Sequence, residues 1–74
     1  MTVPAKKPKS WAIRHFSQAN PEGKGQADVP VLLRRVADSI EAFGHIEVQD
    51  ITFQTEITGG GPWHSLTVYF HDKR

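Results

Sequence analysis

The sequence predicts an α+β fold in which one helix packs on one face of a three-stranded antiparallel sheet. Residues Asp28–Phe43 carry apolar side chains at spacings of three and four, which predicts an amphipathic helix. Two apolar runs, Ile46–Ile57 and Trp63–His71, flank the stretch Thr58–Pro62, whose three glycines and proline interrupt strands, so the pattern predicts a long β-hairpin. An alternating run, Ser10–Phe16, precedes the helix and predicts a further strand. The expected order is β-α-β-β.

The size and composition of the chain indicate one small domain. A chain of 74 residues buries only about 60% of the surface that its unfolded form exposes. The sequence contains no cysteine, so disulfides and thiolate metal sites cannot add stability. Self-association is then the simplest way for so small a core to gain stability.

Charge divides the chain into two parts. We expect residues 1–9, with three lysines and two prolines, to form a disordered basic arm and residues 10–74 to form a single domain. The latter carry six Lys and Arg residues against eight Asp and Glu residues, a net charge of −2. No apolar run is long enough to span a bilayer, and no apolar segment follows the N-terminal lysines as in a secretory signal, so we expect a cytoplasmic protein with no membrane partner.

The first predicted strand places alternate residues on opposite faces. We expect the helix side to carry Trp11, Ile13 and His15, and the open side to carry Ala12, Arg14 and Phe16. Residues Ser17–Ala27 then form a polar loop. Its Gly23-Lys24-Gly25 lacks the glycine spacing and the hydroxyl residue of a phosphate-binding loop, so the glycines are interpreted as hinge residues.

The predicted helix has recognisable ends. Asp28 can cap the first turn, although Val29 could itself be the cap residue because it precedes Pro30. Gly44 is expected to end the helix. The apolar stripe consists of Val29, Leu32, Leu33, Val36, Ala37, Ile40 and Phe43.

The second strand contains a change of phase. Ile46 and Val48 are even-numbered, whereas Ile51, Phe53 and Ile57 are odd-numbered, and a regular strand would place the two sets on opposite faces. One extra residue near Gln49-Asp50 restores a single apolar face, so the sequence predicts a β-bulge or sharp bend there.

A right-handed crossover between the first two strands leaves a gap that the third strand can fill, which predicts the sheet order 1-3-2. The helix should then cover the apolar residues of one face: Leu66, Val68, Phe70, Ile51, Phe53, Ile57, Trp11 and Ile13.

One helix leaves the other face of the sheet open. Aromatic residues among threonines with few charges are typical of an interface, although Thr and Tyr also favour ordinary solvated strands. The predicted contact residues are Trp63, Tyr69, Thr67, Gln54 and Arg14.

The sequence favours a non-catalytic role. No serine has an evident base and orienting group, because Ser65 and His64 are adjacent in a strand and point to opposite faces. His15 and His64 are expected to be neighbours on the helix side, without a third ligand for a metal. We expect neither a metal nor a cofactor.

Two alternatives concern ligands. An aromatic sheet face with Arg14, together with Lys6, Lys7 and Lys9 of the arm, would suit nucleic acid, although the net charge of residues 10–74 argues against it. The order and length of the elements also resemble the dodecins, small flavin-storing proteins whose sheets wrap one helix and assemble into shells. That resemblance implies an oligomer that binds a flavin-like small molecule, and here Trp63 follows the hairpin loop.

The sequence thus predicts a small binding or interaction module that self-associates, as a dimer or a larger oligomer, through the open face or an edge of its sheet. A different protein partner is also compatible with this prediction.

Overall fold

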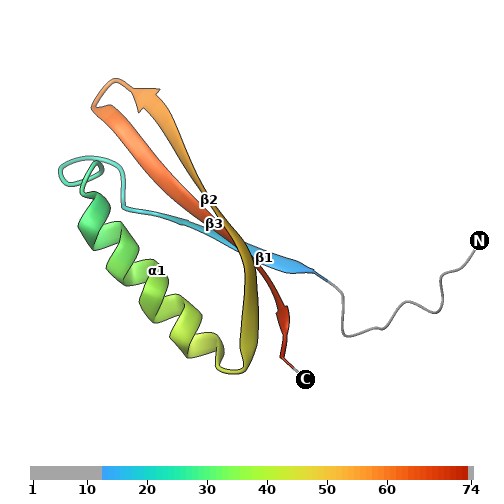
Figure 1. Cartoon of the computed structure of the whole chain (residues 1–74). Helices are drawn as coiled ribbons and strands as arrows, with labels where there is room; N and C mark the ends of the chain where they lie inside the picture. The colour runs from blue at the N-terminus through green and yellow to red at the C-terminus, as the bar shows by residue number, and fades with distance from the viewer. Residues whose placement is uncertain (1–12, 74) are drawn as a thin grey trace, which may run out of the picture.

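The computed structural model describes residues 13–73, which form one helix and three strands (Figure 1). The elements are β1 (Arg14–Ala19), α1 (Val29–Phe43), β2 (Ile46–Thr58) and β3 (Gly61–Asp72). The predicted basic arm lies outside the described residues. Within residues 13–73 no helix is both long enough and apolar enough to cross a bilayer.

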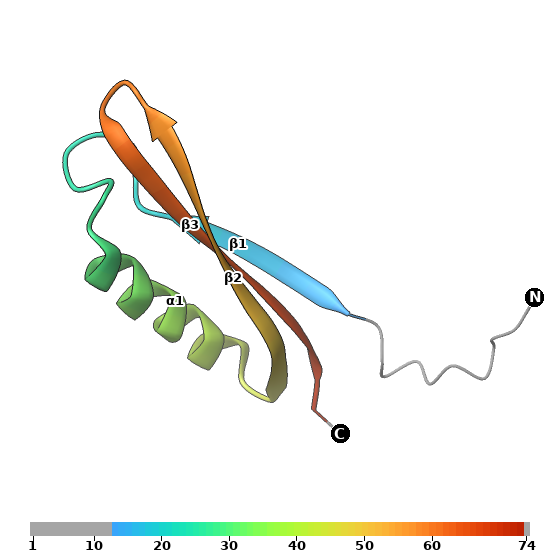
Figure 2. The same cartoon turned by 45° about the horizontal axis from the view of Figure 1, so that its top comes forward.

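The three strands form one antiparallel sheet in the predicted order, with β3 in the centre between β1 and β2. Both views show α1 on one side of this sheet and the β2–β3 hairpin extending beyond the N-terminal end of the helix (Figures 1 and 2). The predicted α+β class and topology are confirmed. The central position of β3 also agrees with its composition, because Leu66–Phe70 is rich in residues that favour strands.

The ends of α1 follow from local chemistry. Asp28 is the N-cap, and its carboxylate accepts a hydrogen bond from the backbone N–H of Val31 at 3.1 Å. Pro30 occupies the first turn, where a missing N–H costs nothing. Gly44 ends the helix at a φ of +83°, a conformation that side chains other than glycine rarely adopt.

The bulge in β2 is present where the phase of the sequence predicts it. The register with β3 shifts between Val48 and Asp50, so Gln49 is the extra residue. Val48 pairs with Phe70 and Ile51 pairs with Val68, which keeps the apolar residues before and after the bulge on one face.

The core lies between α1 and the two strands β1 and β3. Its fully buried side chains come from the helix and from the central strand. Phe16, Ile40 and Ile46 pack around them, and the rings of Phe43 and Phe70 are 5.0 Å apart. The buried core residues are Leu32, Val36, Leu66, Val68 and Phe70.

The helix does not cover the whole of its face of the sheet. A helix is about 10 Å wide and strands are about 4.8 Å apart, so one helix covers roughly two strands. Here those strands are β1 and β3. The prediction that the helix would also cover Ile51, Phe53 and Ile57 of β2 is wrong: all three side chains are exposed.

The hairpin turn is tighter than predicted. Thr58 pairs with Gly61, so only Gly59 and Gly60 connect the strands. Pro62 belongs to β3 and pairs with Ile57. It is tolerated in the central strand because β1 ends opposite Ser65, which leaves this part of β3 with a neighbour on one side only.

The first strand differs from its prediction in position and in orientation. It runs from Arg14 to Ala19, so the expected loop begins three residues later than predicted, and residues 10–12 lie outside the described part of the chain. Phe16 pairs with Val68 on the helix side, whereas His15 pairs with Tyr69 on the open side. The predicted faces were therefore reversed. Alternation defines two faces but does not say which one is buried, and aromatic residues occur in both phases of this strand.

Candidate functional site

The largest group of exposed apolar side chains on one element lies on the helix-side face of β2. We call these four residues, Val48, Ile51, Phe53 and Ile57, the β2 strip. Their exposed fractions are 36%, 47%, 49% and 77%. They share a face with the buried residues of β3 but lie beyond the reach of the helix. The remaining exposed large apolar side chains are distributed over α1 and the residue before β1.

His64 borders the β2 strip. Its ring stacks on Phe53 with centroids 5.0 Å apart, and its Nδ1 lies 2.8 Å from the hydroxyl of Thr55. Thr55 and His64 are directly opposite each other in the register. The Thr55 contact thus helps to position the His64 ring that stacks on Phe53.

The strip lies on an edge strand. With the order β1-β3-β2, one side of β2 has no neighbouring strand among the described residues. A 13-residue edge with apolar side chains is a template for pairing with another strand, and proteins commonly shield such edges.

The open face of the sheet is more polar. The hydroxyls of Ser17 and Thr67 are 2.8 Å apart, and the rings of His15 and Tyr69 are 5.7 Å apart. Thr67 is only 8% exposed because it lies in the middle of the central strand. Some of the polar and aromatic side chains of this face therefore already have partners on the neighbouring strand.

The structure brings four of the five predicted contact residues together. Trp63, Thr67 and Tyr69 project from the open face of β3, and Gln54 projects from the same face of β2, opposite Ser65. Arg14 is not with them, because it pairs with Phe70 on the helix side.

Arg14 has structural partners on that side. Its guanidinium donates a hydrogen bond of 2.9 Å to Asp72 and lies 5.1 Å from the centre of the Phe70 ring. Without Arg14, the described part of the open face contains no lysine or arginine. The lysines of the arm lie outside the described residues, so the nucleic-acid alternative stays a prediction.

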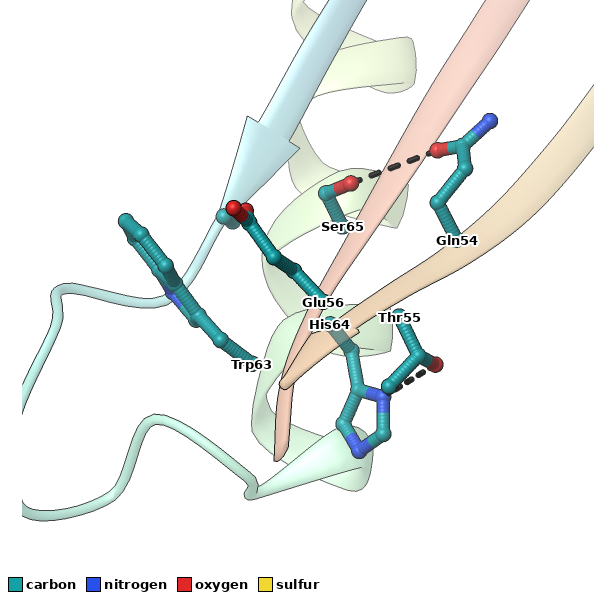
Figure 3. A pocket seen from close by; sticks show the side chains of 7 residues that line it. Gln54, Thr55, Glu56, Trp63, His64 and Ser65 are labelled. Carbon is teal, nitrogen blue, oxygen red and sulfur yellow. Dashed lines mark hydrogen bonds between the residues drawn. The ribbon is translucent and has the colours of Figure 1, made fainter. Parts of the chain in front are cut away.

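A hollow of about 170 Å³ lies on the open face near the hairpin end (Figure 3). Figure 3 shows Trp63, Glu56, Ser65 and Gln54 on the same side of the hairpin, whereas His64 and Thr55 project to the other side. The lining residues are Ala19, Gln54, Thr55, Glu56, Trp63, His64 and Ser65.

Trp63 is fixed by the loop that follows β1. Its indole N–H donates a 2.7 Å hydrogen bond to the backbone carbonyl of Asn20. Asn20 is 3% exposed, and its side-chain amide donates to the carbonyls of Asp28 at 2.8 Å and Gly25 at 3.3 Å. The loop therefore supplies the hydrogen-bond acceptor that positions the indole beside the hollow.

The sequence interpretation did not include Glu56 or Asn20 in the site. Glu56 pairs directly with Trp63, and a correct hairpin register would have shown this, because a two-residue turn at Gly59-Gly60 places these residues opposite each other. Asn20 carries no comparable signal, since its role depends on how the loop folds onto β3.

The histidines are separated in the structure. His15 lies on the open face and His64 on the helix side, so the prediction that they are neighbours is wrong. His71 lies 3.9 Å from Glu47. Across residues 13–73 no three His, Cys, Asp or Glu side chains lie close enough together to hold a metal ion.

Comparison with protein-family models, with curated proteins and with solved structures gave no significant match for this chain.

Proposed function

We propose that the chain is a small, non-catalytic interaction module that pairs with a second copy of itself along β2. The observation that carries this proposal is the β2 strip, a row of apolar side chains that the helix leaves exposed on an edge strand. The sequence predicts self-association through the open face or an edge of the sheet, and β2 is such an edge. We also propose the cytoplasmic location that the sequence predicts.

A second copy is a suitable occupant because β2 is self-complementary in an antiparallel arrangement. A two-fold axis at Thr52 places Ile51 of one copy opposite Phe53 of the other. The same register sets Asp50 against Gln54, so no two charges of the same sign face each other. A shift of the axis by one residue, to Phe53, would instead oppose Asp50 and Glu56.

The expected association is weak. Full burial of an Ile or Phe side chain stabilises by about 1.5–3 kcal/mol, and Ile51 and Phe53 are already about half buried. Burial of the remaining exposed surface of these side chains in both copies, together with hydrogen bonds between the strands, offsets an association cost of about 4–15 kcal/mol. We therefore expect a dimer that dissociates on dilution.

Sedimentation equilibrium over about a hundredfold range of concentration tests the proposal. The average mass of the wild-type chain should rise towards that of a dimer. Ile51→Lys should abolish this rise, because it places a charge in the centre of the strip. Ile13→Lys is the matched control, since Ile13 is similarly exposed at 56% but lies outside β2.

A wild-type chain that stays monomeric throughout, or an Ile51→Lys variant that associates as well as the control, would refute pairing along β2. If Ile13→Lys abolished association and Ile51→Lys did not, the interface would lie at the start of β1 instead. Circular dichroism of each variant establishes that the lysine has not unfolded the domain.

A further inference from the structure

The hollow on the open face arises where β1 stops and the hairpin continues. Ala19 pairs with Ser65 in the last step of the β1–β3 ladder. Trp63 lies two residues further along the same face, so no β1 side chain stands beside it. The missing strand and the small Ala19 side chain leave the space that the Trp63 ring borders.

Glu56 faces Trp63 across this space. The two residues are direct cross-strand partners, which places their Cβ atoms about 5 Å apart. The Glu56 carboxylate forms no ion pair with any residue between 13 and 73. Figure 3 shows this carboxylate on the same side of the hairpin as the indole.

The polar groups of the hollow offer several acceptors, whereas most of its donors are already used. The indole N–H of Trp63 donates to Asn20, and the Ser65 hydroxyl donates to Gln54 Oε1 at 3.2 Å. The Gln54 amide nitrogen donates to the Thr52 hydroxyl at 2.7 Å. The second N–H of that amide has no partner among residues 13–73, and the acceptors left for a ligand include the carboxylate of Glu56 and the remaining lone pair of Gln54 Oε1.

The surroundings favour a cation. The hairpin residues 46–72 include no lysine or arginine, and Glu56 is the acidic side chain that lines the hollow. An indole face attracts cations through its quadrupole, and a carboxylate opposite it adds a direct charge interaction. The volume of about 170 Å³ is below the 300–1,000 Å³ typical of sites for drug-sized ligands, so it suits a group the size of a side-chain end.

We propose that this hollow binds a guanidinium group, carried either by a free small molecule or by an arginine side chain of a peptide. The guanidinium plane stacks on the Trp63 indole, while its N–H groups donate to Glu56 and to Gln54 Oε1. A guanidinium meets these requirements better than an ammonium because it is planar and presents several N–H donors in one plane. The site is on the face opposite the β2 strip and does not depend on self-association.

The test uses ¹H–¹⁵N correlation spectra of the full chain titrated with N-acetyl-arginine amide. The indole N–H signal of Trp63 and the side-chain amide of Gln54 should shift together and saturate. N-acetyl-citrulline amide has the same shape without the charge and should bind at least about fivefold more weakly. N-acetyl-lysine amide should also bind more weakly.

Glu56→Gln keeps the size of the side chain and removes its charge at an exposed position, so it should weaken arginine binding by about fivefold. Glu47→Gln is the matched control, because Glu47 lies on the same face of the same strand at its far end, and it should leave binding unchanged. The titration is repeated on Ile51→Lys, which should not self-associate. Arginine binding by this variant would show that the hollow acts independently of pairing along β2.

Equal binding of the citrulline or lysine derivative, or unchanged binding in Glu56→Gln, would overturn the proposal, as would the absence of any shift at Trp63. An arginine-containing tripeptide distinguishes the two sources of the group. Tighter binding than that of N-acetyl-arginine amide would support a peptide ligand, and equal binding would support a free guanidinium compound.

Discussion

The side-chain amide of Gln26 lies 3.0 Å from the hydroxyl oxygen of Thr58 and thereby joins the loop before the helix to the tip of the hairpin. The same nitrogen donates to the carbonyls of Gly61 at 3.1 Å and Pro62 at 3.3 Å. The amide oxygen accepts from the N–H of Gly23 at 2.8 Å, and the residue is 3% exposed. One buried side chain therefore satisfies polar groups of two segments that are far apart in the sequence.

Replacement of Gln26 should destabilise the domain. Gln26→Ala removes the bonds to the Gly23 N–H and to the Pro62 and Gly61 carbonyls, of which Gly61 keeps the Thr58 hydroxyl as a donor, and it should lower the free energy of unfolding by about 2 kcal/mol. Gln26→Glu should cost more at neutral pH, because a carboxylate oxygen would face three oxygen atoms. Urea denaturation followed by circular dichroism measures both changes.

Gln49→Ala is the control for these variants, since Gln49 is exposed and should change stability by no more than about 0.5 kcal/mol. If Gln26→Ala cost no more than this control, the contacts at the hairpin tip would not contribute to stability.

Deletion of Gln49 should be far more damaging than its replacement by alanine. Without the extra residue, either Ile46 and Val48 or the later apolar residues of β2 must turn to the open face. Since Ile46 packs against the core, we expect a loss of about 3 kcal/mol or more, or a chain that does not fold. Thermal unfolding of the deletion and of Gln49→Ala makes the comparison, and equal stability would show that the assigned register is wrong.

The two partners of Arg14 should contribute unequally. Asp72→Asn should change stability by no more than about 0.5 kcal/mol, because the ion pair is solvent-exposed, with side-chain exposures of 53% and 65%. Arg14→Ala also removes the guanidinium from above the Phe70 ring and should cost about 1 kcal/mol. A double-mutant cycle measured by urea denaturation separates the two effects, and a coupling that accounts for the whole loss would contradict this assignment.

The sequence was sufficient for the order of the elements because their signals were local, and the handedness rule for crossovers then gave the sheet order. The spacing in Asp28–Phe43 identified the helix, and the phase change in β2 placed the bulge at Gln49. The orientation of β1 was not accessible in this way, because both phases of that strand contain apolar residues and only pairing with β3 selects Phe16 for the core.

The candidate sites were predicted only in part for a related reason. Trp63 and Gln54 could be placed on one face from their register in the hairpin. The exposure of Ile51 and Phe53 depends on how far one helix extends across the sheet, which is a tertiary property that alternation along a strand does not encode.

The central position of β3 also determines when each part of the chain can become ordered during synthesis. The hairpin partners of β3 are its neighbours in sequence, but Ser17 and Thr67, which share a hydrogen bond, are 50 residues apart. Since β1 and β2 each pair with β3 alone, neither has a partner strand until β3 has been synthesised, and Phe16 has no aromatic neighbour from the sheet until Phe70 has been translated.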